Sequence, residues 1–199
     1  MKENSKNYFQ RKFNKKIKLY KRRGISGLGK SIAEAELKGA ALLWRSMFAT
    51  DAGLTLDIGT GNGQFWERVI PPDDLILMDI SDFKDCHRYS FGCIIADAEV
   101  LPIKPSTINR VVSLGLIEYL PKLKPVFSSW REIVQDRGRM LFSNSPPKLQ
   151  NYLRNLSGIR VFPRTDQEVK EILGVTNWKI LNDKPILVGW QSLYAVEAV

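Results

Sequence analysis

The chain has 199 residues and an ordinary balance of apolar and charged side chains, which suits one domain with a substantial core. No stretch approaches the roughly 18 uncharged apolar residues of a membrane-spanning helix, and the basic N-terminus lacks the apolar segment of a secretory signal. The two cysteines, Cys86 and Cys93, are too few for a disulfide framework. We therefore expect a cytoplasmic protein.

The positive charge is concentrated at the N-terminus. Residues 1–30 contain eleven Lys and Arg and a single acid, Glu3, which gives this segment a net charge of +10. The whole chain carries +9, so the remaining residues 31–199 carry −1. We therefore divide the chain into a basic N-terminal arm, 1–30, and a domain, 31–199.

Within the arm, apolar side chains recur at helical spacing and are surrounded by Lys and Arg. A basic amphipathic helix of this kind can lie on an anionic membrane, bind nucleic acid or dock on its own domain. The sequence does not separate these roles, so an anionic partner at residues 8–23, either RNA or a membrane surface, stands beside docking. The apolar positions are Phe9, Phe13, Ile17 and Tyr20.

A second helical pattern precedes the first predicted strand. Ser31 and Glu34 have the spacing of a capping box, which predicts that a helix starts at Ser31. Apolar residues then repeat on one face of this helix, and we expect Trp44 to pack in the core. They are Leu37, Ala41, Trp44 and Phe48.

The segment Leu54–Gly63 reads as a short buried strand followed at once by three alternating glycines. Gly59, Gly61 and Gly63 allow a sharp turn and a close approach of the main chain to a ligand. The next residues, Gln64–Ile70, are predicted to begin a helix. This order of strand, glycine turn and helix presents nucleotide-like ligands at the carboxyl edge of an open α/β sheet.

The spacing argues against two common phosphate-binding loops. A dinucleotide fingerprint would place its third glycine at position 64, which is Gln64, and the loop G-x-x-x-x-G-K-[ST] is absent. Asp57 stands at the end of the strand instead. Its carboxylate would repel a pyrophosphate but would attract a ligand that carries ammonium and sulfonium groups. A glycine turn in some other α/β domain is the alternative.

Two further acids follow predicted strands. Leu75–Ile80 is a buried strand whose Asp79 lies twenty residues after Gly59, where α/β nucleotide sites place a carboxylate that accepts from both ribose hydroxyls. A helix N-cap is the alternative role for Asp79. Cys93–Ala96 is a third short strand, and Asp97 follows it.

From about Leu54 to Asn144 the sequence resembles the class I S-adenosylmethionine-dependent methyltransferases, most closely the branch that methylates small and lipophilic molecules. The glycine turn has the form of the first motif of that family. The segment that begins Asp97-Ala98 resembles its D-A-x-x-L-P segment, in which the acid accepts from the adenine amino group. The resemblance implies S-adenosylmethionine as the cofactor. The cofactor-binding residues that we predict are Asp57, Gly59, Thr60, Gly61, Gly63, Asp79, Ile80, Asp97, Ala98 and Leu114.

The later patterns continue the alternation of strands and helices. In the resembled family such elements form a doubly wound, mostly parallel seven-stranded sheet, a Rossmann-like methyltransferase fold whose last strand is antiparallel, and this is the fold class that we expect. The predicted strands are 109–114, 139–144, 178–181 and 190–196. The predicted helices are 126–136, which Gly138 would end, and 165–174, which a capping box of Thr165 and Glu168 would open.

Side chains suited to other chemistry are scarce. Cys86, His87 and Cys93 offer at most three metal ligands, and an adjacent Cys and His rarely reach one ion, so we expect no metal. Methyl transfer can draw most of its rate from orientation and needs a base only when the nucleophile arrives protonated. Glu118 and Tyr119, after the fourth strand, are the candidate catalytic residues, with a structural role as the alternative.

The sequence thus predicts methyl transfer from S-adenosylmethionine to a small or lipophilic acceptor, whose identity it does not give. One alternative is an RNA methyltransferase that uses the basic arm. The other is a partner subunit that binds the cofactor without transferring methyl. Co-purified nucleic acid would favour the first alternative, and tight cofactor binding without any acceptor would favour the second.

Overall fold

The computed structural model describes residues 28–81, 90–148, 160–186 and 189–199. Seven strands form one sheet in the order β3-β2-β1-β4-β5-β7-β6. Strands β1 to β5 are parallel, and β7 runs antiparallel to both of its neighbours, β5 and β6. The strands are β1 (Thr55–Ile58), β2 (Leu75–Asp79), β3 (Gly92–Ile95), β4 (Ile108–Ser113), β5 (Val134–Asn144), β6 (Trp178–Ile186) and β7 (Gln191–Ala198).

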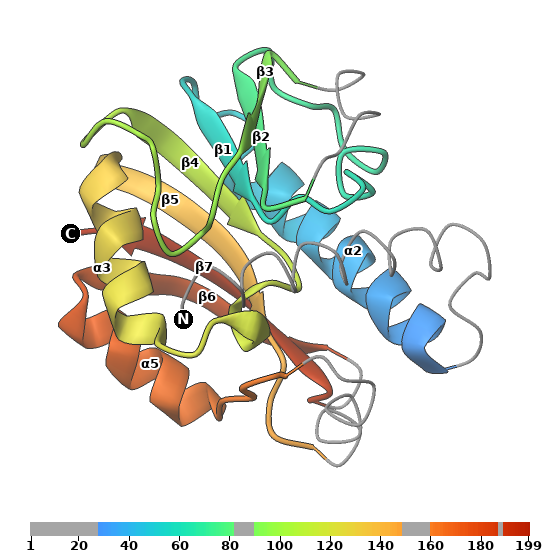
Figure 1. Cartoon of the computed structure of the whole chain (residues 1–199). Helices are drawn as coiled ribbons and strands as arrows, with labels where there is room; N and C mark the ends of the chain where they lie inside the picture. The colour runs from blue at the N-terminus through green and yellow to red at the C-terminus, as the bar shows by residue number, and fades with distance from the viewer. Residues whose placement is uncertain (1–27, 82–89, 149–159, 187–188) are drawn as a thin grey trace.

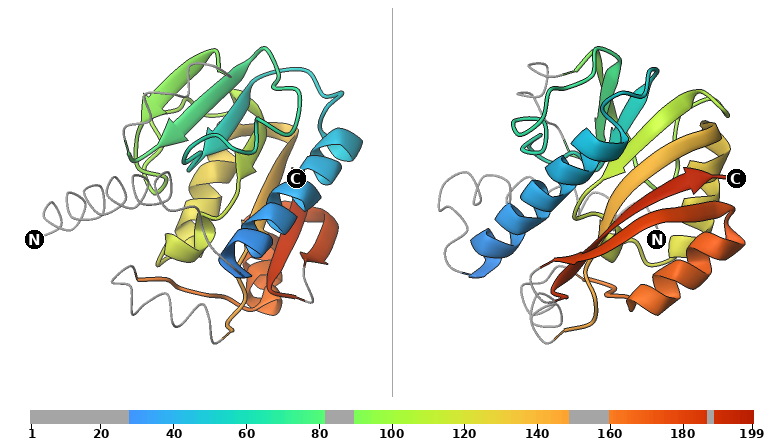
Figure 2. Two further views of the ribbon diagram at one scale, coloured as in Figure 1. Left: turned by 90° about the vertical axis from the view of Figure 1, so that its right-hand side faces the viewer. Right: turned by 180° about the vertical axis from the view of Figure 1, so that it is seen from behind.

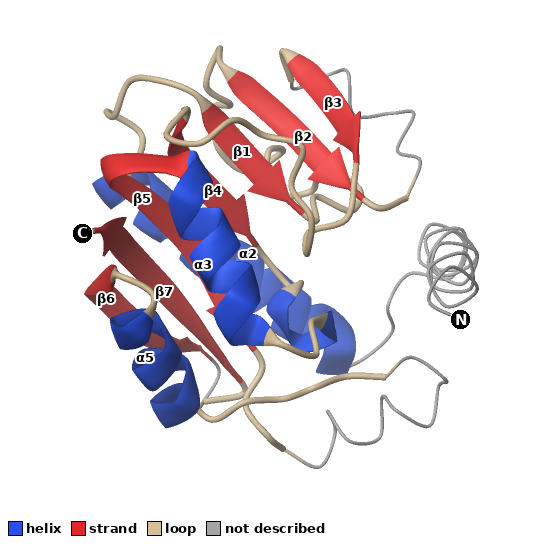
Figure 3. Cartoon of the chain, turned by 60° about the vertical axis from the view of Figure 1, so that its left-hand side comes forward, coloured by secondary structure: helices blue, strands red, loops and turns tan. Residues whose placement is uncertain are grey.

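Helices cover both faces of the sheet (Figures 1 and 3). Helix α2 lies on one face, and α3 and α5 lie side by side on the other. The predicted fold class, a doubly wound and mostly parallel seven-stranded sheet with an antiparallel last strand, is therefore confirmed. The helices are α2 (Leu28–Met47), η2 (Ile117–Tyr119, a single 3-10 turn), α3 (Leu123–Ile133) and α5 (Asp166–Val175).

The core beneath α2 is built around aromatic rings. Trp44 is 2% exposed and stacks on Phe48, while Phe65 and Trp66 meet it edge-on. The expected core role of Trp44 is therefore confirmed. Because these rings come from α2 and from the turn after β1, they fix the helix to the strand that carries the glycine turn.

The opposite face packs α3 and α5 on the second half of the sheet. Phe127 and Trp130 of α3 are fully buried, and Phe127 contacts Phe142 of β5 edge-on. The Trp130 indole N–H donates to the main-chain oxygen of Ala98, 2.9 Å away. This hydrogen bond joins the loop after β3 to α3, so α3 helps to fix the position of that loop.

Two predicted helix starts turned out differently. The predicted cap at Ser31 is wrong, because α2 already begins at Leu28. The predicted helix at Gln64–Ile70 is also wrong: this segment forms a series of turns. Phe65 and Trp66 are adjacent in the sequence and both almost fully buried, a pattern that a turn allows more easily than one face of a surface helix.

The predicted end of the next helix was late by three residues. Helix α3 ends at Ile133, and β5 begins at Val134 rather than at Arg139. Gly138 therefore lies inside β5, where an added Cβ would stand 2.5 Å from the Val134 side chain. The pairing of β5 with β4 shifts in register between Val134, opposite Ile108, and Arg139, opposite Arg110. The capping box of Thr165 and Glu168 at the start of α5 is confirmed.

Several predictions lie outside the described residues. They include the amphipathic pattern of the arm, its proposed partner segment at 8–23, and the residues Cys86 and His87. Within the ranges that the structure describes, no helix has the length and apolar character needed to cross a bilayer.

Candidate cofactor and acceptor site

The carboxyl ends of β1, β2, β3 and β4 border a cavity of about 850 Å³. The strand order reverses between β1 and β4, and this switch point is where open α/β sheets bind ligands. The N-terminal half of α2 extends past the carboxyl ends of β1 and β2 (Figures 1 and 2). It contributes Ala33, Glu36 and Leu37 to the cavity wall, so the helix that covers the sheet also closes one side of the cavity.

The glycine turn is held at the centre of this edge. Gly59, Gly61 and Gly63 all have positive φ angles, of 77°, 60° and 72°, which favour glycine. The Gly59 N–H donates to the Met78 oxygen at 2.7 Å and so continues the ladder between β1 and β2. A Cβ at Gly59 would lie 2.9 Å from the Leu116 side chain, whereas a Cβ at Gly61 would meet open space. A side chain at Gly59 would therefore displace Leu116, in addition to the strain from its φ angle.

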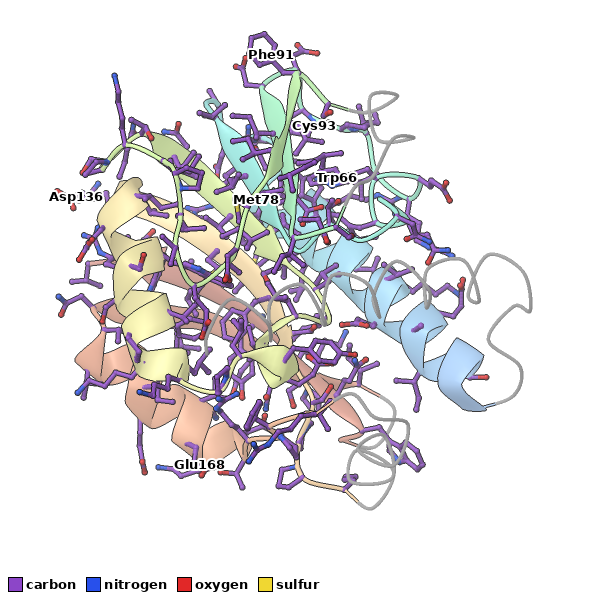
Figure 4. The ribbon with its side chains drawn as sticks, in the orientation of Figure 1. Trp66, Met78, Phe91, Cys93, Asp136 and Glu168 are labelled. Carbon is purple, nitrogen blue, oxygen red and sulfur yellow. The ribbon has the colours of Figure 1, made fainter. Side chains whose placement is uncertain are left out.

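Asp57 is buried at the end of β1 and lines the cavity. One of its carboxylate oxygens accepts from the Trp66 indole N–H at 2.7 Å, and Figure 4 labels Trp66 in this region of the molecule. Burial raises the pKa of Asp57 from 3.8 to about 7; the nearby Asp79 charge adds to the rise, while the Thr60 hydroxyl and the Trp66 indole oppose it. A cationic group in the cavity would favour the charged form of Asp57.

Asp79 holds the main chain around the cavity. One carboxylate oxygen accepts from the Gly61 N–H at 2.9 Å. The other accepts from both the N–H and the hydroxyl of Ser81, at 2.8 and 2.7 Å. A carboxylate has about four lone-pair positions, so three are engaged within the chain and about one remains for a ligand. Accepting two ligand hydroxyls would require one internal bond to be exchanged.

The loop after β3 forms the third part of the wall. Asp97 accepts from the Glu99 N–H at 3.0 Å through a carboxylate oxygen and bonds Val100 N through its main-chain oxygen. Ala98 is buried, and its oxygen accepts from Trp130 as described above. The turn is therefore fixed locally and from α3, with Asp97, Ala98 and Val100 all bordering the cavity.

Nine of the ten residues predicted for the cofactor border this one cavity. The tenth, Gly63, does not border the cavity. Its main-chain oxygen accepts from the main-chain N–H of Trp66 at 3.0 Å. The structure thus brings together residues from four separate strand ends. Their contacts with a cofactor remain a prediction.

The two candidate catalytic residues are placed differently. Tyr119 borders the cavity, but Glu118 does not. Glu118 is 3% exposed and lies 3.4 Å from the Ser145 hydroxyl. The pKa of the nearby Arg164 is lowered by burial, and the charge of Glu118 is one of the effects that oppose this shift. This placement favours a structural role for Glu118.

Sequence reasoning missed the other side of the cavity. Glu36 of α2 is 8% exposed, and its carboxylate lies 4.0 Å from the point where a Cβ on Gly115 would stand. Glu36 lies on the same helical face as the apolar Leu37 and Ala40, and this pattern in the sequence could have indicated a buried acid at a site. Arg160 and Phe162 also border the cavity, but no local pattern points to either of them.

Among the residues that the structure describes, no group of three or more His, Cys, Asp or Glu could hold a metal ion. Cys93 lies in β3, on the edge of the sheet, and Figure 4 shows it close to Phe91, whose side chain points away from the molecule.

No protein-family model matches the sequence. A malonyl-[acyl-carrier protein] O-methyltransferase from Methylococcus capsulatus is 24% identical over 130 residues, which span 60% of this chain and 46% of that protein. The chain thus spans about half the length of this curated relative.

Solved structures match more of the chain at lower identity. Magnesium protoporphyrin IX methyltransferase from Synechocystis, with bound SAH, aligns over 100% of both chains with a TM-score of 0.70 and 16% identity. The [4+2]-cyclase SpnF aligns over 81% of this chain and 80% of its own, with a TM-score of 0.65 and 12% identity. The chain therefore has the fold of the class I S-adenosylmethionine-dependent methyltransferases.

Proposed function

We propose that this protein transfers a methyl group from S-adenosylmethionine to a small-molecule acceptor. The observation that carries the proposal is the convergence of Asp57, Asp79 and the glycine turn on one cavity at the switch point of the sheet. Asp57 and the glycines were expected from the sequence as one motif, and Asp79 from its spacing after Gly59. A cavity of about 850 Å³ falls within the roughly 300–1,000 Å³ of small-molecule sites.

The residues present fit this cofactor. A cationic ligand would stabilise the charged form of Asp57, which burial disfavours. Asp79 keeps part of its acceptor capacity for a hydroxyl. The main chain at Gly61 is open to the cavity. Asp97 lies on a fixed turn, where its carboxylate can accept from an amine.

When bound, the cofactor supplies an activated methyl group on a sulfonium. The task of the protein is then to hold the two reactants in line, which is worth up to roughly 7–11 kcal/mol in favourable systems. Leu114, Gly115 and Leu116 follow β4 and border the cavity beside the glycine turn. Glu36 approaches Gly115 from α2. These groups can exclude water and position the acceptor.

The nature of the acceptor is inferred from the site and from the relatives. The names of the relatives refer to a malonyl-[acyl-carrier protein] and to magnesium protoporphyrin IX, and the present cavity is partly apolar, with Leu37, Leu116 and Phe162 in its walls. A small or lipophilic acceptor fits such walls. SpnF, a cyclase, has a similar fold, so the fold alone does not decide the reaction.

A methyl-transfer assay tests the proposal. The full-length chain is given S-adenosylmethionine with a labelled methyl group and, in separate reactions, pooled small metabolites or total RNA. We expect label in the small-molecule fraction and none with Asp79→Ala. Label in RNA would favour the role of the basic arm as an RNA-binding segment. Tight cofactor binding without label in either fraction would contradict the proposal and favour a non-catalytic subunit.

A further inference from the structure

The cavity has two chemically distinct halves. The half at the ends of β1, β2 and β3 carries the acids Asp57, Asp79, Asp97 and Glu99. The other half lies between α2, the segment that follows β4, and residues 160–164. Its apolar side chains are Leu37, Leu116, Tyr119, Leu120, Pro121 and Phe162.

Residues 160–164, which we call the strap, are held by hydrogen bonds to the segment after β4. The Phe162 N–H donates to the main-chain oxygen of Glu118 at 2.6 Å. The Arg164 guanidinium donates to the main-chain oxygens of Ile117, at 3.0 Å, and Leu120. It also donates to the Phe162 oxygen at 3.1 Å. These bonds join two segments about 45 residues apart, so they hold the strap as a fixed wall.

Arg160 stands on this strap at the rim of the cavity. It is exposed, yet it borders the cavity, and its guanidinium carbon lies 5.1 Å from the centre of the Phe162 ring. Stacking on an aromatic ring orients the guanidinium. Among the described residues that border the cavity it is the only Arg or Lys. Within the described part of the chain, Arg160 makes no ion pair with a carboxylate.

We propose that the acceptor is an amphipathic anion, with an apolar body against Leu116, Leu120 and Phe162 and a carboxylate or phosphate held by Arg160. The inference rests on the proposed function and deepens it. A guanidinium binds carboxylate and phosphate through paired N–H donors, which a neutral or cationic acceptor does not use. Its placement beside an aromatic ring and an apolar wall selects a molecule with both characters.

The acids of the cavity do not oppose this assignment. Asp57, Asp79, Asp97 and the exposed Glu99 lie in the other half, where a bound cofactor would present its cationic groups and hydrogen-bond donors. Glu36 stands near Gly115, between the halves. An anion at the rim would lie in the apolar half, away from these carboxylates, and among the described residues Arg160 is the cation that borders the cavity there.

The test compares ligands that differ only in their head group. Octanoate, octyl phosphate, octanol and octyltrimethylammonium are titrated into the full-length chain saturated with S-adenosylhomocysteine, and binding is followed by ligand-observed NMR. Cofactor saturation is verified first by calorimetry. A failure to bind S-adenosylhomocysteine would count against the proposed function itself, whereas the head-group comparison concerns the acceptor alone.

We expect one or both anions to bind about fivefold more tightly than octanol, as for an ion pair partly open to solvent, and octyltrimethylammonium to bind most weakly. Which anion binds more tightly identifies a carboxylate or a phosphate acceptor. Arg160→Gln should remove the preference for the anion and leave octanol binding unchanged. Lys179→Gln, which removes an exposed cation from the edge strand β6, should keep it.

Three results would overturn the inference. The first is equal binding of octanol and both anions by the wild-type chain. The second is a preference for the anion that survives in Arg160→Gln. The third is an equal loss of octanol and anion binding in Arg160→Gln, because a lost wall contact would then explain the effect without any charge.

Discussion

The two halves of the cavity are built in different ways. The cofactor half comes from short segments at or just after the carboxyl ends of β1, β2 and β3, and each segment places its own acid or glycine at the sheet edge. The acceptor half combines α2, the segment after β4 and the strap 160–164, which main-chain and Arg164 hydrogen bonds hold together. The first half depends on local sequence and the second on tertiary contacts, so substitutions in the two halves should act differently.

The largest effect is expected at Asp79. Asp79→Ala removes a charged acceptor of a ligand hydroxyl and also releases the Gly61 N–H and both Ser81 donors. Cofactor affinity should fall by a few kcal/mol, and the melting temperature should fall as well. Ser81→Ala is the matched control, since it removes only one of these bonds and should cost about 1 kcal/mol or less in affinity. Calorimetry and thermal unfolding measure both. Equal effects of the two variants would show that Asp79 only supports the turn.

The next effect concerns the charge of Asp57 and depends on pH. Its pKa of about 7 in the free protein lies above its value of 3.8 without burial. Protons therefore compete with a cationic cofactor, and affinity should fall as the pH drops below about 7, by up to tenfold per pH unit. Asp57→Asn should bind weakly at every pH and lose this dependence. A wild-type affinity that stays constant from pH 8 to pH 5.5 would contradict the assignment.

The same group affects folding in the opposite direction. Because the folded state binds the Asp57 proton more tightly than the unfolded state does, the contribution of Asp57 to stability is fully present below pH 3.8 and is lost as the pH rises through about 7. At pH 8 Asp57→Asn should therefore stabilise the free protein, by up to a few kcal/mol, since each pKa unit is worth about 1.4 kcal/mol. Urea unfolding at pH 8 and pH 5 checks the sign.

A further prediction concerns Glu36, which lies between the cofactor half and the acceptor half of the cavity. Glu36 borders the cavity, and its carboxylate would attract a sulfonium held nearby. Glu36→Gln should therefore weaken the binding of S-adenosylmethionine, which carries a sulfonium, by about 1–2 kcal/mol. S-adenosylhomocysteine, which has an uncharged sulfur, should be affected less. Glu34→Gln is the control, because Glu34 is on the same helix but pairs with Arg68 at the surface. Equal losses of affinity for the two ligands would show that Glu36 does not act on the sulfonium.

The smallest catalytic effect is expected at Glu118. Its burial away from the cavity and its contact with Ser145 favour a structural role. Glu118→Gln should lower the melting temperature and change kcat little. A general base would instead give a loss of about 10²-fold or more in kcat, with an acid limb in the pH profile that disappears in the variant. That second outcome would show that Glu118 is a catalytic residue, although it lies in the segment to which residues 160–164 are hydrogen-bonded.

The cofactor half could be predicted from the sequence because its residues lie at or just after the carboxyl ends of their strands. Asp57, Asp79 and Asp97 needed only a strand pattern and a turn to place them at one edge. The helix predicted at Gln64–Ile70 failed because burial of Phe65 and Trp66 against Trp44 outweighs local propensity. The placement of Arg160 at the cavity could not be predicted for a similar reason. It depends on hydrogen bonds from the strap to main-chain carbonyls more than 40 residues earlier.

The most direct test of the central claim is a calorimetric titration of the full-length chain with S-adenosylhomocysteine and, separately, with NAD. The account predicts that S-adenosylhomocysteine binds with one-to-one stoichiometry, that NAD does not bind, and that Asp79→Ala loses the binding. Tighter binding of NAD, or binding of S-adenosylhomocysteine that is unchanged in Asp79→Ala, would contradict the assignment of this cavity.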